Sequence, residues 1–125
     1  MFNLLNLSLV FIGGGLGSLF RYGVGLMILS NLKVYFPMGT FIVNITGCFL
    51  LGLILGLVEG KKLISPEMGL LFGTGFCGGF TTFSTFSVEG FKMIEDGEWM
   101  VFLGYTAGSV GIGLLLAMLG MKLTR

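Results

Sequence analysis

The stretch GTGFCGGFTTFSTFS, residues 73–87, decides how the chain folds. It lies within an apolar run from about residue 68 to 91, yet its glycines and hydroxyl-bearing residues make it a poor continuous helix. At membrane depth, non-helical backbone is tolerated only where it is buried in protein, lines a cavity or binds an ion. We therefore expect a break in the middle of a membrane span, with the glycine-rich part before Thr81 leaving the helical path.

The composition indicates that the solvent of this protein is largely lipid. Hydrophobic residues make up 54% of the 125 residues and charged residues only 10%, with a mean hydropathy of +1.00. A water-soluble domain has about 25% charged residues, which coat its surface. The length suits one domain, residues 1–125.

Four apolar segments are each long enough to cross the roughly 30 Å hydrocarbon core of a bilayer. They run from about 4 to 29, 39 to 58, 68 to 91 and 99 to 121. The connections are short, so consecutive helices should be antiparallel neighbours and both termini should lie on one side. Small residues recur at i, i+4 spacing, such as Gly13 with Gly17, which predicts close helix packing and an oligomer. The predicted fold class is an all-α membrane protein with four transmembrane helices.

The basic residues do not fix one orientation in the membrane. One side carries Lys61, Lys62, Lys122 and Arg125, and the other carries Lys33 and Lys92, with Arg21 if it reaches outward. This is a weak asymmetry for a topology that depends on Lys and Arg in short loops. A chain that inserts both ways can form an antiparallel dimer.

Two polar residues in the first two spans require an explanation, because polar groups in a membrane are costly. Arg21, beside Tyr22, is either an anchor that reaches the interface or a fixed charge that draws anions into a vestibule. Asn44 either joins two helices or donates a hydrogen bond from its amide to an anion in a pore.

The residues beyond the predicted break combine hydroxyl groups with aromatic rings. On a resumed helix, Phe83 and Phe86 share a face, and Ser84 with Ser87 and Thr81 with Thr85 form hydroxyl rows. Ring edges are positive and can stabilise a small anion, and hydroxyls can supply hydrogen bonds. Core packing is the ordinary alternative for an aromatic stripe.

Polar residues also occur on the last span and near the end of the third. Tyr105, Thr106 and Ser109 form a polar stripe on the last span, which interhelical hydrogen bonds would explain. Glu89 lies near the end of the third span, at the interface or in a water-filled vestibule. Unwound backbone carbonyls are hard oxygen ligands suited to Na⁺, so a structural cation needs no carboxylate here.

Several function classes are disfavoured by the sequence. The absence of histidine removes imidazole bases, and no nucleophile–base pair or ligand cluster is visible, so we do not expect an enzyme. A net charge of +1 gives no basic field for nucleic acid.

Three patterns together resemble the Fluc/CrcB family of bacterial fluoride channels, over nearly the whole chain. They are GGxxGxxxRY (residues 13–22), GTxxVNxxGxF (39–49) and GxCGGxTTFSTFS (75–87). The resemblance implies a multi-pass protein of the bacterial inner membrane that forms an antiparallel, dual-topology homodimer with two pores.

The resemblance also assigns roles to residues. It implies a central structural Na⁺ held by the backbone carbonyls of Gly78 and Thr81, and a vestibule whose charge is Arg21. It implies a fluoride pathway formed by Asn44, Phe83, Phe86, Ser84, Thr85, Tyr105 and Ser109. The position one turn beyond Ser109, where a second hydroxyl is common in the family, is Gly113.

The resulting hypothesis is passive, electrogenic fluoride efflux. A small anion follows from the residues themselves, whereas fluoride follows from the resemblance. The alternative is a proton-coupled small exporter of dual topology. That class needs an ionisable group deep in the membrane, and the first acidic residue is Glu59, at the end of the second span. A structural protein would explain the glycine spacing but not the hydroxyl and aromatic residues behind the break.

Overall fold

The computed structural model describes residues 2–31 and 35–125, which form helices and short connections and contain no strand. The helices are α1 (Leu4–Asn31), α2 (Met38–Leu55), η1 (Gly56–Gly60), α3 (Pro66–Gly69), η2 (Leu70–Cys77), α4 (Gly78–Phe80), α5 (Phe83–Glu95) and α6 (Trp99–Thr124). The two η segments are π-helical. The all-helical prediction is confirmed for this part of the chain.

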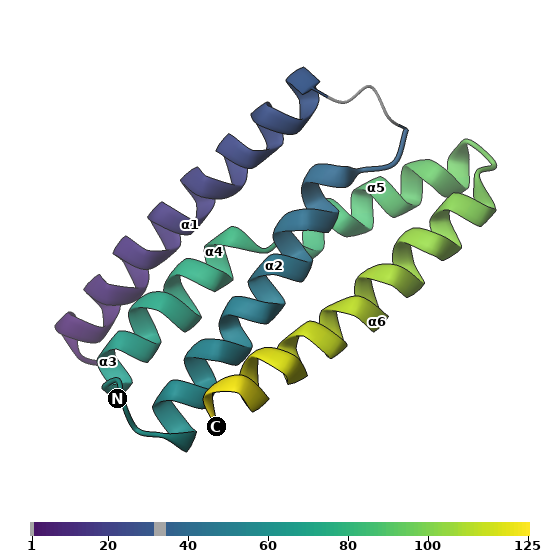
Figure 1. The fold of residues 1–125 in the computed structure, drawn as a ribbon. Helices are drawn as coiled ribbons and strands as arrows, with labels where there is room; N and C mark the ends of the chain where they lie inside the picture. The colour runs from purple at the N-terminus through teal and green to yellow at the C-terminus, as the bar shows by residue number, and fades with distance from the viewer. Residues whose placement is uncertain (1, 32–34) are drawn as a thin grey trace.

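The helices form a layer of nearly aligned rods (Figure 1). α3, η2 and α4 follow one another without interruption and pack beside α1, while α2 packs mainly against α6. α5 leaves the end of α4 and leads to α6 at the far end of the layer. Both chain ends lie at the end of the layer opposite the α5–α6 turn.

Three of the described helical segments are long and apolar enough to cross a membrane: Leu4–Leu29, Met38–Gly60 and Trp99–Thr124. The third apolar segment of the sequence is instead divided between residues 66–80 and α5, and each part is shorter than the roughly 20 residues that a span needs. Large apolar side chains such as Phe11 and Leu19 are exposed, as expected for a surface that faces lipid.

The ends of the third segment follow local sequence rules. The Ser65 hydroxyl accepts a hydrogen bond from the Met68 N–H, and Pro66 occupies the first turn of α3. At the other end, Gly97 has φ +75°, a conformation that glycine adopts without strain, and it forms the turn before α6.

Two extended residues separate α4 from α5. Thr81 has φ −85° and ψ 160°, and Thr82 has φ −149° and ψ 120°. The expectation that the glycine-rich stretch itself leaves the helical path is wrong, because residues 70–80 are helical. Gly79 serves packing: a Cβ there would collide with the Gly14 carbonyl, so the backbones of α4 and α1 touch directly.

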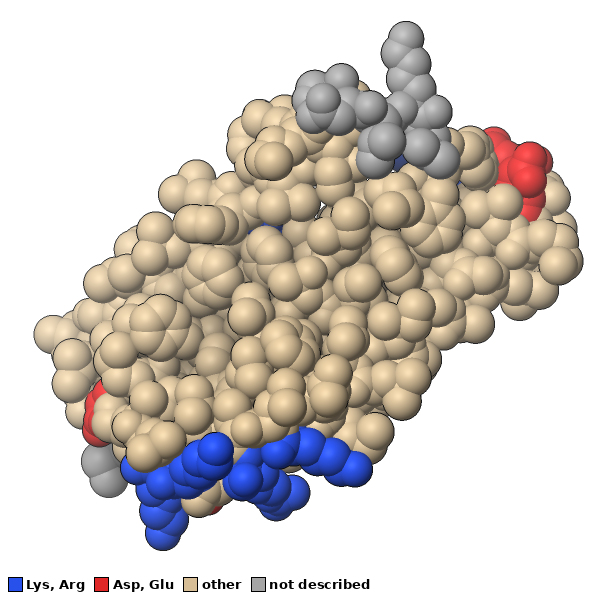
Figure 2. All heavy atoms as spheres, viewed as in Figure 1, with Lys and Arg blue, Asp and Glu red and all other residues tan. Residues whose placement is uncertain are grey.

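Charged residues gather at the ends of the molecule (Figure 2). The basic group lies where the C-terminus and the α2–α3 connection meet, and the band between the ends is almost entirely uncharged on this face. Lys61, Lys62, Lys122 and Arg125 belong to these segments. Lys33, which the orientation argument also used, lies outside the described residues.

Candidate functional site

The candidate site is built around the extended residue Thr82. The side chain of Asn44, on α2, bonds to both the N–H and the carbonyl of Thr82. The Asn44 Nδ2 donates to the Thr82 carbonyl at 3.0 Å, and the Thr82 N–H donates to the Asn44 Oδ1 at 2.7 Å. An amide side chain thus replaces the two helical partners that Thr82 would have in an unbroken helix. Asn44 has a second amide hydrogen, so the pairing uses only one of its donors.

The break frees two backbone carbonyls of the third segment. In a continuing helix the Gly78 carbonyl would accept from the Thr82 N–H, but that group donates to Asn44. The Thr81 carbonyl would likewise accept from the Thr85 N–H, which donates instead to the Thr82 Oγ1 at 3.2 Å. Both Gly78 and Thr81 line a cavity, so carbonyl oxygens that have lost their helical donors there suit a hard cation such as Na⁺.

Hydroxyl groups continue from the break into α5, but one of the two rows that the helical spacing predicts does not form. The Thr82 Oγ1 donates to the Thr85 Oγ1 at 3.1 Å and lies 3.4 Å from the Ser84 Oγ. The Thr81 hydroxyl instead bonds back to the Cys77 carbonyl at 2.9 Å. The predicted Thr81–Thr85 row is therefore wrong, because Thr81 is extended and shares no helix with Thr85.

Aromatic rings line up behind these hydroxyls. The centroids of Phe83 and Phe86 are 5.9 Å apart, and those of Phe86 and Tyr105 are 5.0 Å apart. Phe83 is 79% exposed, whereas Tyr105 is fully buried. The rings thus lead from the open surface of the chain to its interior, and core packing does not account for Phe83.

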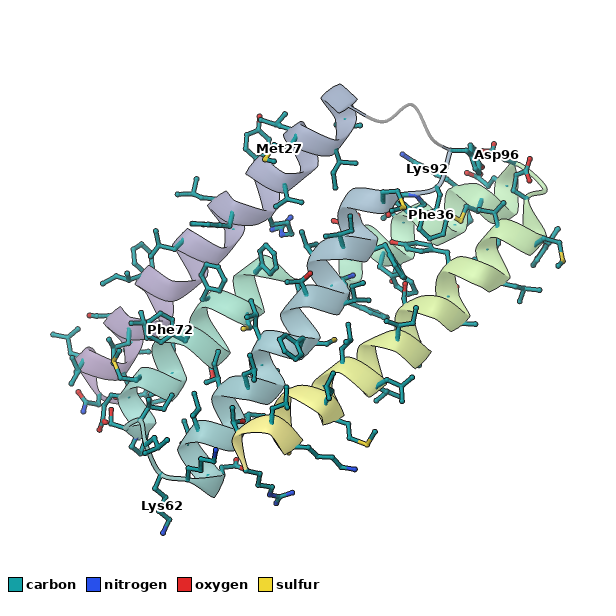
Figure 3. All side chains as sticks on the ribbon, viewed as in Figure 1. Met27, Phe36, Lys62, Phe72, Lys92 and Asp96 are labelled. Carbon is teal, nitrogen blue, oxygen red and sulfur yellow. The ribbon has the colours of Figure 1, made fainter. Side chains whose placement is uncertain are left out.

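Glu89, on α5, bonds to side chains of two other helices. Its carboxylate accepts from the Thr40 Oγ1 at 2.7 Å and from the Tyr105 Oη at 2.9 Å, which links α5 to α2 and α6. Phe36 packs its ring edge-to-face against Tyr105 with centroids 5.3 Å apart, and Figure 3 shows Phe36 near Asp96 at this end of the molecule. Glu89 is half-buried within the bundle rather than held at its outer surface.

Arg21 turns into the protein. Its Nε donates to the Gly79 carbonyl at 3.1 Å, so the arginine does not extend to the interface as the anchor interpretation requires. Arg21 and Glu89 line one cavity together, as the vestibule interpretation requires.

Two cavities meet at Thr82. The first, which we call the arginine cavity, has a volume of about 440 Å³ and is lined by residues that include Arg21, Tyr22, Thr40, Thr82, Thr85 and Glu89. The second, the asparagine cavity, has about 480 Å³ and is lined by residues that include Asn44, Gly78, Thr81, Thr82, Phe83, Phe86 and Ser109. Among the described residues, Thr82 is the one that lines both cavities.

Most of the predicted site residues therefore line one of these two cavities. Ser84 and Tyr105 line neither cavity but contact residues that do, through Thr82 and Phe86 respectively. The Ser109 Oγ is buried and has no hydrogen-bond partner among the described residues, which leaves this lining hydroxyl available to a ligand.

Sequence reasoning missed the importance of Thr82 and Thr40. Thr82 could have been found, because threonine is a favoured N-cap residue and helix α5 begins at the next position. Thr40 carries no such signal, since its contact with Glu89 joins residues 49 positions apart.

Long apolar helices around polar, cavity-lining residues define a multi-pass helical membrane protein. The particular family follows from comparison with known proteins. Residues 8–121 match the family model described as "CrcB-like protein, Camphor Resistance (CrcB)", and the chain belongs to this family.

Curated relatives match over nearly their full lengths. A protein of Gloeothece citriformis is 42% identical over 122 residues, covering 98% of each chain. A protein of Pyrococcus horikoshii is 47% identical over 122 residues, covering 95% of each chain. A protein of Oceanobacillus iheyensis is 45% identical over 118 residues, covering 94% of this chain and 90% of the relative. Each of these relatives is named "Fluoride-specific ion channel FluC".

Proposed function

We propose that this protein is a fluoride-selective channel of the bacterial inner membrane that lets fluoride leave the cytoplasm passively and carries its charge across. The names of the relatives support fluoride as the ion. The observation that carries the proposal is Thr82, an extended residue that is held by Asn44 and shared by two cavities. In the proposed channel, residues 66–80 and α5 together make the third span, with the break at membrane depth.

The arrangement meets the energetic requirement for a small anion. Bare transfer of fluoride into a low-dielectric interior would cost on the order of tens of kcal/mol. A channel must replace its water with successive weak donors that allow both entry and exit. The hydroxyls of Ser84, Thr85 and Ser109 and the second amide hydrogen of Asn44 are such donors, and none of them carries a fixed charge.

The aromatic residues supply a second kind of contact. The rings of Phe83 and Phe86 can turn their positive edges to fluoride without a net charge that would trap it. Phe86 contacts Tyr105, whose hydroxyl is bonded to Glu89, so the ring path leads towards the arginine cavity. There Arg21 would raise the local anion concentration.

We further propose that the channel is an antiparallel homodimer of dual topology with a structural Na⁺ between the subunits. The high exposure of Phe83 beside the asparagine cavity supports a second copy that covers this face. The freed carbonyls of Gly78 and Thr81 support the cation, for which they would be hard oxygen ligands. When bound, Na⁺ would supply a positive charge that attracts the Gly78 and Thr81 carbonyls of both subunits.

The proposed function is tested by ion efflux from liposomes that contain the purified protein. Liposomes loaded with fluoride or chloride are diluted into ion-poor buffer, with an ionophore for the counter-cation and with or without a pH gradient. We expect fast fluoride release, little chloride release and no requirement for the pH gradient. Fluoride release that occurs only with a proton gradient would instead support the exporter class.

A further inference from the structure

The end of helix α4 has a backbone carbonyl that its own helix cannot satisfy. Helix ends leave their last carbonyls without intrahelical donors. For Gly79 the missing donor is the N–H of Phe83, which begins α5 beyond two extended residues. The Arg21 Nε supplies a donor to this carbonyl from α1, 58 positions earlier in the chain.

A seam of glycines places Arg21 against this carbonyl. A Cβ at Gly17 would collide with the Phe76 carbonyl, and a Cβ at Gly79 would collide with the Gly14 carbonyl. The seam therefore holds the two backbones in direct contact and fixes their register. Arg21 follows Gly17 by four residues and lies on the same face of α1, one turn closer to the break.

We propose that Arg21 is a positioning residue that caps the end of α4 through its Nε–H and so fixes where the backbone leaves the helix. Arg21 of α1 and Asn44 of α2 thus bond to the backbone on either side of Thr81. Arg21 bonds to Gly79 before the break, and Asn44 bonds to Thr82 within it. A positive charge placed at any of several positions around the arginine cavity would attract anions. The cap, in contrast, requires the Arg21 Nε–H at the Gly79 carbonyl.

Lysine separates the two roles of the arginine. It keeps one positive charge, but its compact ammonium lies at the end of a flexible stem and lacks the planar fork that contains Nε–H. Arg21→Lys therefore keeps the charge and removes the cap, whereas Arg21→Gln removes both. Arg125→Lys, at the exposed chain end, is the matched control for the exchange itself.

The test is amide hydrogen exchange of the wild-type protein and these three variants in lipid nanodiscs. We expect Arg21→Lys and Arg21→Gln both to accelerate exchange several-fold at Thr81, Thr82 and Thr85, with α6 unchanged, and Arg125→Lys to match the wild type. Wild-type exchange in Arg21→Lys would overturn the proposal. So would faster exchange throughout α6, because the proposal confines the effect to the break.

The ionic-strength dependence of fluoride efflux provides a second readout, and this one rests on the proposed function. If Arg21 caps the helix, Arg21→Lys lowers efflux severalfold at low and high salt alike, because the defect is not screened. If Arg21 acts only as a charge, Arg21→Lys matches the wild type and the deficit of Arg21→Gln shrinks as salt rises, which would overturn the proposal. An inactive wild-type protein would refute the channel and leave the exchange result standing.

Discussion

Residues 70–80 and residues 83–95 belong to one apolar segment of the sequence, but they meet their neighbours in different ways. The first region packs its backbone directly against α1, where Gly13 and Gly79 leave no room for a side chain. The second region, α5, carries hydroxyls, an exposed phenylalanine and a half-buried carboxylate. The difference teaches that the glycines fix one half of the segment so that the other half can present polar groups to the cavities.

The largest effect is expected at the link between the two regions, in Asn44→Asp. A carboxylate cannot donate to the Thr82 carbonyl, and it repels both that oxygen and a passing anion. A loss of about 3 kcal/mol corresponds to roughly a hundredfold lower fluoride efflux from liposomes. Asn6→Asp, near the start of α1, is the matched control and should conduct normally. Wild-type efflux in Asn44→Asp would remove Asn44 from the pathway.

The packing half of the comparison is tested by Gly17→Ala and Gly15→Ala, two residues apart on α1. A Cβ at Gly17 would collide with the Phe76 carbonyl, whereas a Cβ at Gly15 meets nothing within 4 Å. Overpacking should cost Gly17→Ala about 1–3 kcal/mol of stability. Gly15→Ala should be neutral or slightly more stable, because alanine favours the helix. Thermal unfolding in detergent measures the stability of both variants. Equal midpoint temperatures would contradict the close packing of α1 against residues 70–80 at Gly17.

The polar half is tested by Tyr105→Phe. This change removes the hydrogen bond to Glu89 and keeps the ring that packs on Phe86 and Phe36. We expect a loss of about 1 kcal/mol, or roughly fivefold slower fluoride efflux. The matched Tyr22→Phe variant removes a hydroxyl from an exposed tyrosine and should have a smaller effect. Equal rates in both variants would show that the Glu89 contact does not matter for permeation.

The smallest effect is expected outside both regions, at the exposed bond from the Tyr35 Oη to the Asp96 carboxylate, 2.9 Å long. This bond raises the pKa of Tyr35 above its ordinary value of 10.0 by favouring the protonated phenol. Its small stabilisation is therefore present at neutral pH and is lost as the pH rises through the raised pKa.

Thermal midpoints of Tyr35→Phe and the wild type should thus differ slightly at pH 7 and converge in strong alkali. A gap that widens with pH would contradict this assignment.

Much of the fold follows from the sequence, because lipid imposes simple requirements. Apolar length predicts the helices at 4–29, 39–58 and 99–121, and the structure extends them by a few residues at most of their ends. The position of the extended residues was not predictable from glycine content alone. Helix propensity disfavours glycine, but Gly79 packs against the Gly14 backbone of α1 and is helical. Tertiary packing decided the outcome.

The candidate site was predictable in its members but not in its bonds. The residue types identified Asn44, Glu89 and Arg21 as polar groups that needed partners. Asn44 bonds to the Thr82 backbone, 38 positions away, and Arg21 bonds to the Gly79 carbonyl, 58 positions away. Glu89 bonds to Thr40, 49 positions away, and to Tyr105, 16 positions away. No local pattern encodes such pairings, because they depend on how the helices pack.

The most direct test of a selective, uncoupled fluoride path is the reversal potential of current through the protein in a planar lipid bilayer. We predict that it shifts by about 59 mV for each tenfold fluoride gradient, the value for a single charge, and that chloride and pH gradients do not move it. A reversal potential that follows the pH gradient, or fluoride transport without current, would contradict the account.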